Sequence, residues 1–176
     1  MLPVMPGLIV KGAGKISLPV GKEQAELLSK VARQAPFGKG METVVDMSVR
    51  NTLEIEPSQV SLENPSWDDA LNKLVQHAAE SLGVQHQLVN AHLYKLLLYG
   101  PGGFFKKHRD TEKADGMFAS LVVQLPSSFT GRSFRVRHGG AIKTFNLGAG
   151  NDSEYVCHFV SHYADCEHEI KNIESG

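Results

Sequence analysis

The stretch that decides the fold is YGPGGFFKKHRD, residues 99–110. A turn rich in glycine and proline opens it, and a segment that ends on His108 and Asp110 follows. If that segment is extended, side chains two residues apart project from the same face of the strand. One imidazole and one carboxylate would then point into a common space. Both groups are ligands for divalent metals, so the stretch predicts a strand that carries part of a metal site.

A third ligand must come from elsewhere, because two ligands leave a divalent ion under-coordinated. The best candidate is His168, which opens the last expected strand, 58 residues after Asp110. Neighbouring strands of a small barrel can bring such distant positions together. Two histidines and one carboxylate on one side of an ion form the facial triad of non-haem Fe(II) oxygenases. We therefore expect His108, Asp110 and His168 to be metal ligands.

Three other interpretations of these residues are open. A solvated salt-bridge face over residues 106–110 would need no metal. His158 and His162 are rivals of His168, but the flanking residues 165–167 favour His168, and we expect the other two to be ordinary polar positions. Zinc takes mixed cysteine and histidine ligands, although the sequence lacks the paired-cysteine knuckle of common zinc sites. The residues of that alternative are Cys157, His158, His162, Cys166 and His168.

The rest of the chain predicts an α+β fold. Residues 22–33 and 67–82 have apolar residues at helical spacing, and residues 8–20 and 43–55 look extended. From residue 88 the texture changes to strands, expected over residues 88–99, 118–125, 134–136, 142–145, 155–159 and 167–173. The sequence His138-Gly139-Gly140 is a hairpin turn candidate. Two helices followed by roughly six strands predict a sheet-rich barrel or jelly roll backed by helices.

Composition excludes several classes of protein. The 176 residues fit one ordinary domain, and 18 basic residues nearly balance 19 acidic ones, so bulk charge does not favour a nucleic-acid or anionic membrane partner. Two cysteines are too few for a disulfide framework and are typical of a reducing compartment. Residues 1–10 contain two prolines and no leading cation, so we expect neither a signal peptide nor a transmembrane segment. The expected location is cytoplasmic or nuclear.

Several segments together resemble the Fe(II)/2-oxoglutarate-dependent dioxygenases of the prolyl 4-hydroxylase-like type. These are residues 94–99 (YKLLLY), 101–103 (PGG), 108–110 (HRD), 117–126 and 163–169 (YADCEHE). The resemblance spans residues 88–176 and implies a double-stranded β-helix, a jelly-roll variant. We expect a single domain over residues 1–176, in which residues 1–87 supply strand and helix support and residues 88–176 an incomplete jelly-roll core.

The resemblance also implies a reaction. Such enzymes use Fe(II) and O₂ to convert 2-oxoglutarate to succinate and CO₂ while they hydroxylate a C–H bond of a second substrate. Tyr99, nine residues before His108, matches a family tyrosine whose hydroxyl holds 2-oxoglutarate. We expect Fe(II) and 2-oxoglutarate as cofactor and cosubstrate. The hydroxylated substrate, protein or small molecule, is not identified by the sequence.

One departure from the family pattern affects the cosubstrate site. Family members hold the distal carboxylate of 2-oxoglutarate with an Arg or Lys that follows the second ligand histidine, whereas this sequence ends at Gly176, eight residues after His168. We therefore expect a portion of a longer enzyme, a truncated gene model or a degenerate copy. Arg135, Arg137 and Lys95 are candidate replacements for the cation. The alternative function is a catalytically inactive metal-binding or interaction protein on the same fold.

Overall fold

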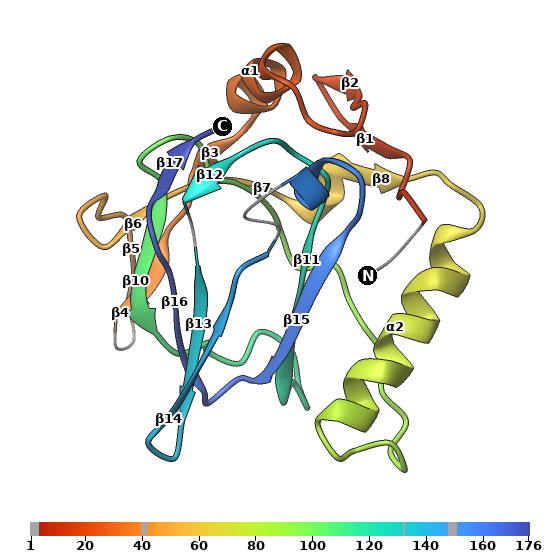
Figure 1. The fold of residues 1–176 in the computed structure, drawn as a ribbon, viewed down its shortest axis with the longest axis vertical. Coiled ribbons are helices and arrows are strands. Elements are labelled where there is room, and N and C mark those ends of the chain that lie inside the picture. The colour runs from red at the N-terminus through yellow and green to blue at the C-terminus, as the bar shows by residue number, and fades with distance from the viewer. Residues whose placement is uncertain (1–3, 40–41, 132, 148–150) are drawn as a thin grey trace.

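The computed structural model describes residues 4–39, 42–131, 133–147 and 151–176 (Figure 1). The first three residues of the segment considered for a signal peptide therefore lie outside it. Over the described ranges the chain is rich in β-strands and has two α-helices, which confirms the expected β-rich fold with helices. Neither described helix combines the length and the apolar character that crossing a membrane requires.

Both helices form where helical spacing predicted them, as α1 (Lys22–Val31) and α2 (Trp67–Ser81). Gly83 follows α2 with a φ of 73°, a left-handed conformation that glycine adopts without steric cost and that ends the helix. The expected extended segment 43–55 is divided, because a turn held by the Asp46 side chain and the Ser48 N–H separates its strands. The strands of this half are β1 (Leu8–Val10), β2 (Gly14–Lys15), β3 (Arg33–Gln34), β4 (Phe37–Lys39), β5 (Glu42–Val44), β6 (Arg50–Asn51), β7 (Leu53–Ile55) and β8 (Val60–Leu62), with the 3-10 turn η1 (Pro57–Gln59).

Two strands of the second half begin later in the chain than expected. Residues 88–95 are not strand, and Leu88 is 92% exposed, because apolar composition without alternation does not define a buried strand face. The strand expected over residues 155–159 begins only at His158. The expected hairpin is confirmed, with Gly139 and Gly140 at φ of 55° and 82°. The elements are β9 (Leu96–Leu98), β10 (Phe104–His108), β11 (Ala119–Gln124), β12 (Thr130–Gly131), β13 (Phe134–His138), β14 (Ala141–Phe145), η2 (Asn151–Glu154), β15 (His158–Tyr163), β16 (Glu167–Ile170) and β17 (Ile173–Ser175).

The sheets join the two halves of the chain. A five-stranded sheet has the order β14-β13-β16-β10-β6, and a three-stranded sheet has the order β3-β7-β9. Strands β6 and β7 thus pair directly with β10 and β9. The first half therefore extends the sheets of the second. Four further sheets are β2-β1-β8, β11-β15, β12-β17 and β4-β5.

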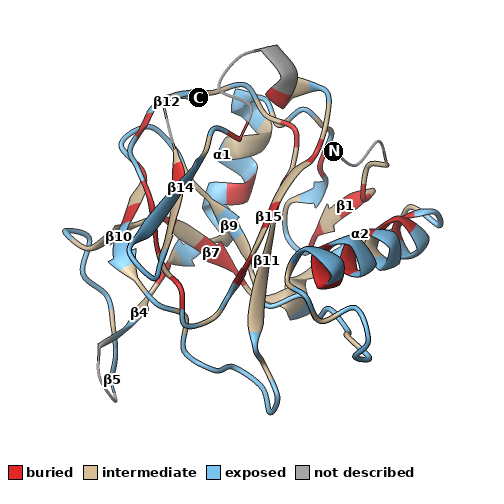
Figure 2. Cartoon of the chain, turned by 60° about the horizontal axis from the view of Figure 1, so that its bottom comes forward, coloured by how far each residue is buried: buried red, intermediate tan, exposed pale blue. Residues whose placement is uncertain are grey.

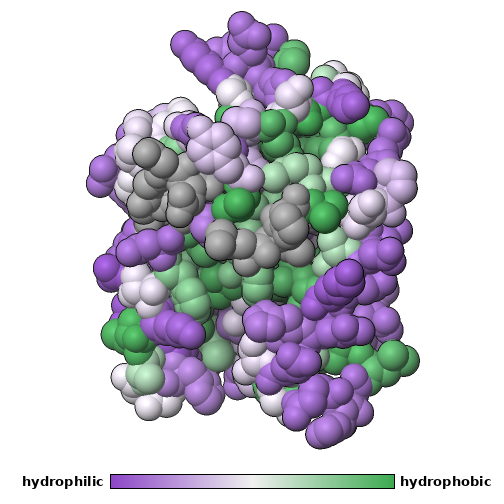
Figure 3. All heavy atoms as spheres, turned by 45° about the vertical axis from the view of Figure 1, so that its right-hand side comes forward, coloured by the Kyte–Doolittle hydropathy of each residue, from purple (hydrophilic) through white to green (hydrophobic). Residues whose placement is uncertain are grey.

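The antiparallel pair β11-β15 has two different faces. Trp67, Ala70 and Leu74 of α2 lie in one buried cluster with Leu121, Val123 and Phe159 of the pair, so α2 covers the outer face (Figures 1 and 2). Figure 3 shows apolar side chains gathered in the middle of one face of the molecule, surrounded by hydrophilic ones.

Residues of the pair that alternate with those under α2 face the five-stranded sheet. Val122 and Val160 accordingly pack in a second cluster with Phe105, Phe134 and Ile170. By the same alternation Ser120 and His162, which are opposite each other in the register, face this interior. Polar groups of both strands are thus brought to one end of an apolar interior.

Candidate metal centre

A β-bulge in β10 turns His108 toward the interior. Phe105 lies opposite Ile170 and His108 lies opposite His168, so β10 has one residue more than β16 between the two pairs. Lys106 and Lys107 are both exposed, whereas a regular strand would send one of them inward. The extra residue returns His108 to the inner face, where its ring stacks on Phe105 with centroids 3.4 Å apart.

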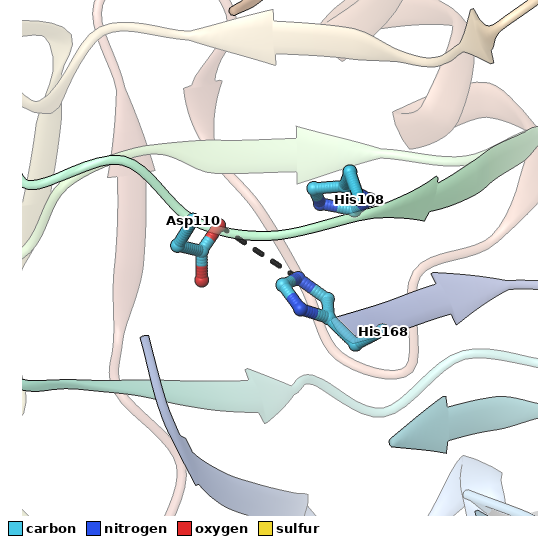
Figure 4. A group of neighbouring side chains, drawn as sticks. All are labelled: His108, Asp110 and His168. Atoms are coloured by element: carbon cyan, nitrogen blue, oxygen red, sulfur yellow. Dashed lines mark ion pairs between the residues drawn. The ribbon is translucent and has the colours of Figure 1, made fainter. Parts of the chain in front are cut away.

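Three potential ligand groups meet at this point. The ligand atoms of His108, Asp110 and His168 all lie within 4.8 Å of one another (Figure 4). Asp110 Oδ1 is 3.7 Å from His168 Nε2, and the two imidazole centroids are 4.1 Å apart. Ligands that each lie about 2.1 Å from one ion are separated by roughly 3–4 Å, so the spacing fits a single cation.

Both imidazoles present Nε2 as the free lone pair. His108 Nδ1 is 2.8 Å from the Lys106 carbonyl oxygen, and His168 Nδ1 is 3.0 Å from that of Cys166. A carbonyl oxygen only accepts, so each Nδ1 carries the proton. Burial, and then the neighbouring His168, lower the pKa of His108 to about 4, so His108 is neutral at pH 7.

The carboxylate is oriented by a serine on the facing pair of strands. Ser120 Oγ donates to Asp110 Oδ2 at 2.5 Å, which leaves Oδ1 on the side of His168. The backbone N–H of Asp110 donates to the Ala164 carbonyl oxygen at 3.2 Å. Asp110 is therefore held from both ends, although it lies just beyond β10.

We expect Ser120→Ala to weaken metal binding about 10- to 100-fold, the usual effect of losing a hydrogen bond to a ligand. Competition of Fe(II) with a chelator would measure the change. Ser161→Ala is the matched control, because Ser161 lies on β15 next to His162 in the chain and alternates to the other face. Equal affinities for the two variants would contradict the role of Ser120.

His162 also lies at this centre, which the sequence interpretation as an ordinary polar position missed. It is 3% exposed, and its ring centroid is 4.3 Å from that of His168. Nδ1 is 2.9 Å from the Tyr163 carbonyl oxygen, and buried Nε2 has no hydrogen-bond partner among the described residues. Burial, followed by His168, lowers the pKa of His162. Its alternation with Val160 on a strand was the available signal.

The three basic residues that could replace the cosubstrate-binding Arg or Lys each lie near glutamates. Lys95 Nζ is 2.6 Å from Glu56 and 3.2 Å from buried Glu54. Arg137 Nη2 donates to Glu169 Oε1 at 3.0 Å, and the nearest guanidinium nitrogen of Arg135 is 4.0 Å from the same oxygen. All three candidate replacements for the cosubstrate cation thus face carboxylates of the chain itself.

Two further residues singled out in the sequence lie in apolar surroundings. Tyr99 is partly buried against the cluster of Phe105 and Phe134. Cys157 is fully buried in the cluster with Trp67 beneath α2. Cys157 thus lies on the α2 side of the pair β11-β15, whereas His162 and His168 lie beside Phe134 on the other side.

Comparison with known proteins gives a likeness to a solved structure. No family model and no curated protein matches the sequence. The chain is similar in structure to a Pseudomonas putida prolyl-4-hydroxylase. The TM-score is 0.48 and the sequence identity 21%, over 79% of this chain and 70% of that one.

Proposed function

We propose that this chain is a non-haem Fe(II)- and 2-oxoglutarate-dependent dioxygenase, a hydroxylase of the prolyl 4-hydroxylase-like type. The observation that carries the proposal is the meeting of His108, Asp110 and His168 within 4.8 Å at one end of an apolar interior. Two imidazoles and one carboxylate are the donor set of the facial triad. The five-stranded sheet and the pair β11-β15, which enclose that interior, support the double-stranded β-helix as the fold.

The residues present fit an iron ion. His108 and His168 would each provide Nε2, and Asp110 would provide Oδ1 while Ser120 retains Oδ2. Bound Fe(II) would supply the redox chemistry that couples O₂ and 2-oxoglutarate to hydroxylation of a C–H bond, with succinate and CO₂ as coproducts. The protein would hold the ligands in place, and Phe105 would limit water on the side of His108.

An open cleft of about 460 Å³ offers a route for the substrate. Its lining is Met117, Phe118, His138, Tyr163, Ala164 and Asp165. Ala164 contacts the triad through its carbonyl oxygen, which accepts from the Asp110 N–H. We place the substrate in this cleft, and we assign the hydroxyl of Tyr99 to 2-oxoglutarate.

One observation favours a second candidate function, a metal-binding protein without turnover. Lys95, Arg135 and Arg137 each face glutamates, so binding of a distal carboxylate by any of them would require breaking an existing ion pair. Without a cation beside it, the distal carboxylate of 2-oxoglutarate would be desolvated and unpaired, which would lower the affinity for 2-oxoglutarate. Iron binding with no cosubstrate turnover is the outcome expected from this candidate.

Succinate formation separates the two candidates. The purified full chain, with Fe(II), ascorbate, O₂ and 2-oxoglutarate, should form succinate only when iron is present. Asp110→Asn should abolish this formation, and His86→Ala, which changes an exposed histidine outside the strands, should leave it intact. Iron binding without succinate would support the metal-binding protein, and absence of both would contradict the two candidates.

A further inference from the structure

A second group of metal-ligating side chains lies near the triad. The ligand atoms of His138, Asp165 and Cys166 lie within 4.8 Å of one another. His138 is the last residue of β13, and Asp165 and Cys166 form the turn between β15 and β16. The group therefore combines a nitrogen, an oxygen and a sulfur donor from two separate parts of the chain.

The strand register explains why these residues meet. In the antiparallel pair β13-β16, Val136 is opposite His168 and Arg137 is opposite Glu167. Continuing that register by one residue places His138 opposite Cys166. Opposed residues share a face, as do residues two apart, so both continue the inner face on which His168 lies.

The second group is distinct from the triad, because the two groups have no residue in common. The two groups are nevertheless linked, because the Cys166 carbonyl oxygen accepts the hydrogen bond from His168 Nδ1. Cys166 thus contributes its backbone to the triad and leaves its thiol for the second group.

We propose that His138, Asp165 and Cys166 bind a second, thiophilic divalent cation of the Zn²⁺ class at the mouth of the interior. Zinc takes this mixed set of imidazole, carboxylate and thiolate ligands. Three protein ligands leave a fourth tetrahedral position open. His138 and Asp165 line the open cleft, so that position is reached by water or by a molecule in the cleft.

The burial of the three residues suits a cation that enters from solvent. Cys166 is only 6% exposed, whereas His138 and Asp165 are exposed. The turn itself is fixed by the Cys166 N–H, which donates to the Tyr163 carbonyl oxygen at 3.0 Å. On coordination the thiol releases its proton to solvent, and sulfur forms the new bond to the metal.

Cobalt(II) is a suitable probe, because thiolate coordination gives it a charge-transfer absorption that histidine and carboxylate ligands do not give. Saturating the metal-free full chain with Co²⁺ should produce this absorption, and added Zn²⁺ should remove it. Cys166→Ser should abolish the absorption. His138→Ala, a change at an exposed residue that does not threaten folding, should weaken cobalt binding at this site at least about 10-fold.

Two controls distinguish this site from the triad and from the other cysteine. His108→Ala should retain the absorption while it loses cobalt bound at the triad, so failure of the iron proposal would leave this result unchanged. Cys157→Ala should also retain the absorption, because Cys157 lies in the core beneath α2. Absence of the absorption in the unmodified chain, or its persistence in Cys166→Ser or at full affinity in His138→Ala, would overturn the proposal.

Discussion

Replacing His108 with alanine should abolish iron binding at the triad. The change removes one of three protein ligands, so affinity should fall by more than the 10- to 100-fold that loss of an outer hydrogen bond causes, that is by more than about 100-fold. Metal analysis after anaerobic loading with Fe(II) and desalting would measure the bound iron. Asp110→Asn should show a loss of similar direction, because a neutral amide replaces the only carboxylate of the group.

His86→Ala is the matched control for this experiment, because it removes an exposed imidazole from a loop and should leave bound iron unchanged. Circular dichroism of each variant would establish that the fold is retained. Stoichiometric iron in a folded His108→Ala variant would exclude His108 as a ligand.

Replacing Phe134 with alanine should destabilise the fold by about 3–5 kcal/mol, the usual range for removing a buried phenylalanine ring. Phe134 is 1% exposed on β13, and its ring centroid lies 5.7 Å from those of both His162 and His168. The resulting cavity would therefore open directly beside the triad. Urea denaturation would measure the free energy of unfolding.

Two further variants serve as controls for Phe134→Ala. Phe134→Leu keeps most of the apolar volume and should cost less than Phe134→Ala. Ile142→Ala changes a 57% exposed residue on the partner strand β14, and its effect should remain within about 0.5 kcal/mol. A loss below 1 kcal/mol for Phe134→Ala would show that this ring is not central to the core.

Local patterns predicted the elements that depend on neighbouring residues. Helical spacing placed α1 and α2, and the glycine pair after His138 placed the hairpin between β13 and β14. Spacing also singled out His108 and Asp110, which the structure brings together with His168. The assignment of an ion to these residues stays a prediction until binding is measured.

Other features depend on contacts between distant segments and could not be predicted in the same way. The bulge in β10 is visible only against the register of β16. The pairing of β6 with β10 joins residues about fifty positions apart. His162 needed the partner strands to show that its side of β15 faces the triad rather than α2.

The hydrogen bonds at the two histidines have a consequence for how the centre tolerates mutation. Each ring is aligned by the backbone carbonyl of the residue two places before it, at Lys106 and at Cys166. Because every amino acid carries that oxygen, residues 106 and 166 can be substituted without altering the imidazole tautomers. The orientation of the two nitrogen donors thus depends on the backbone of the paired strands.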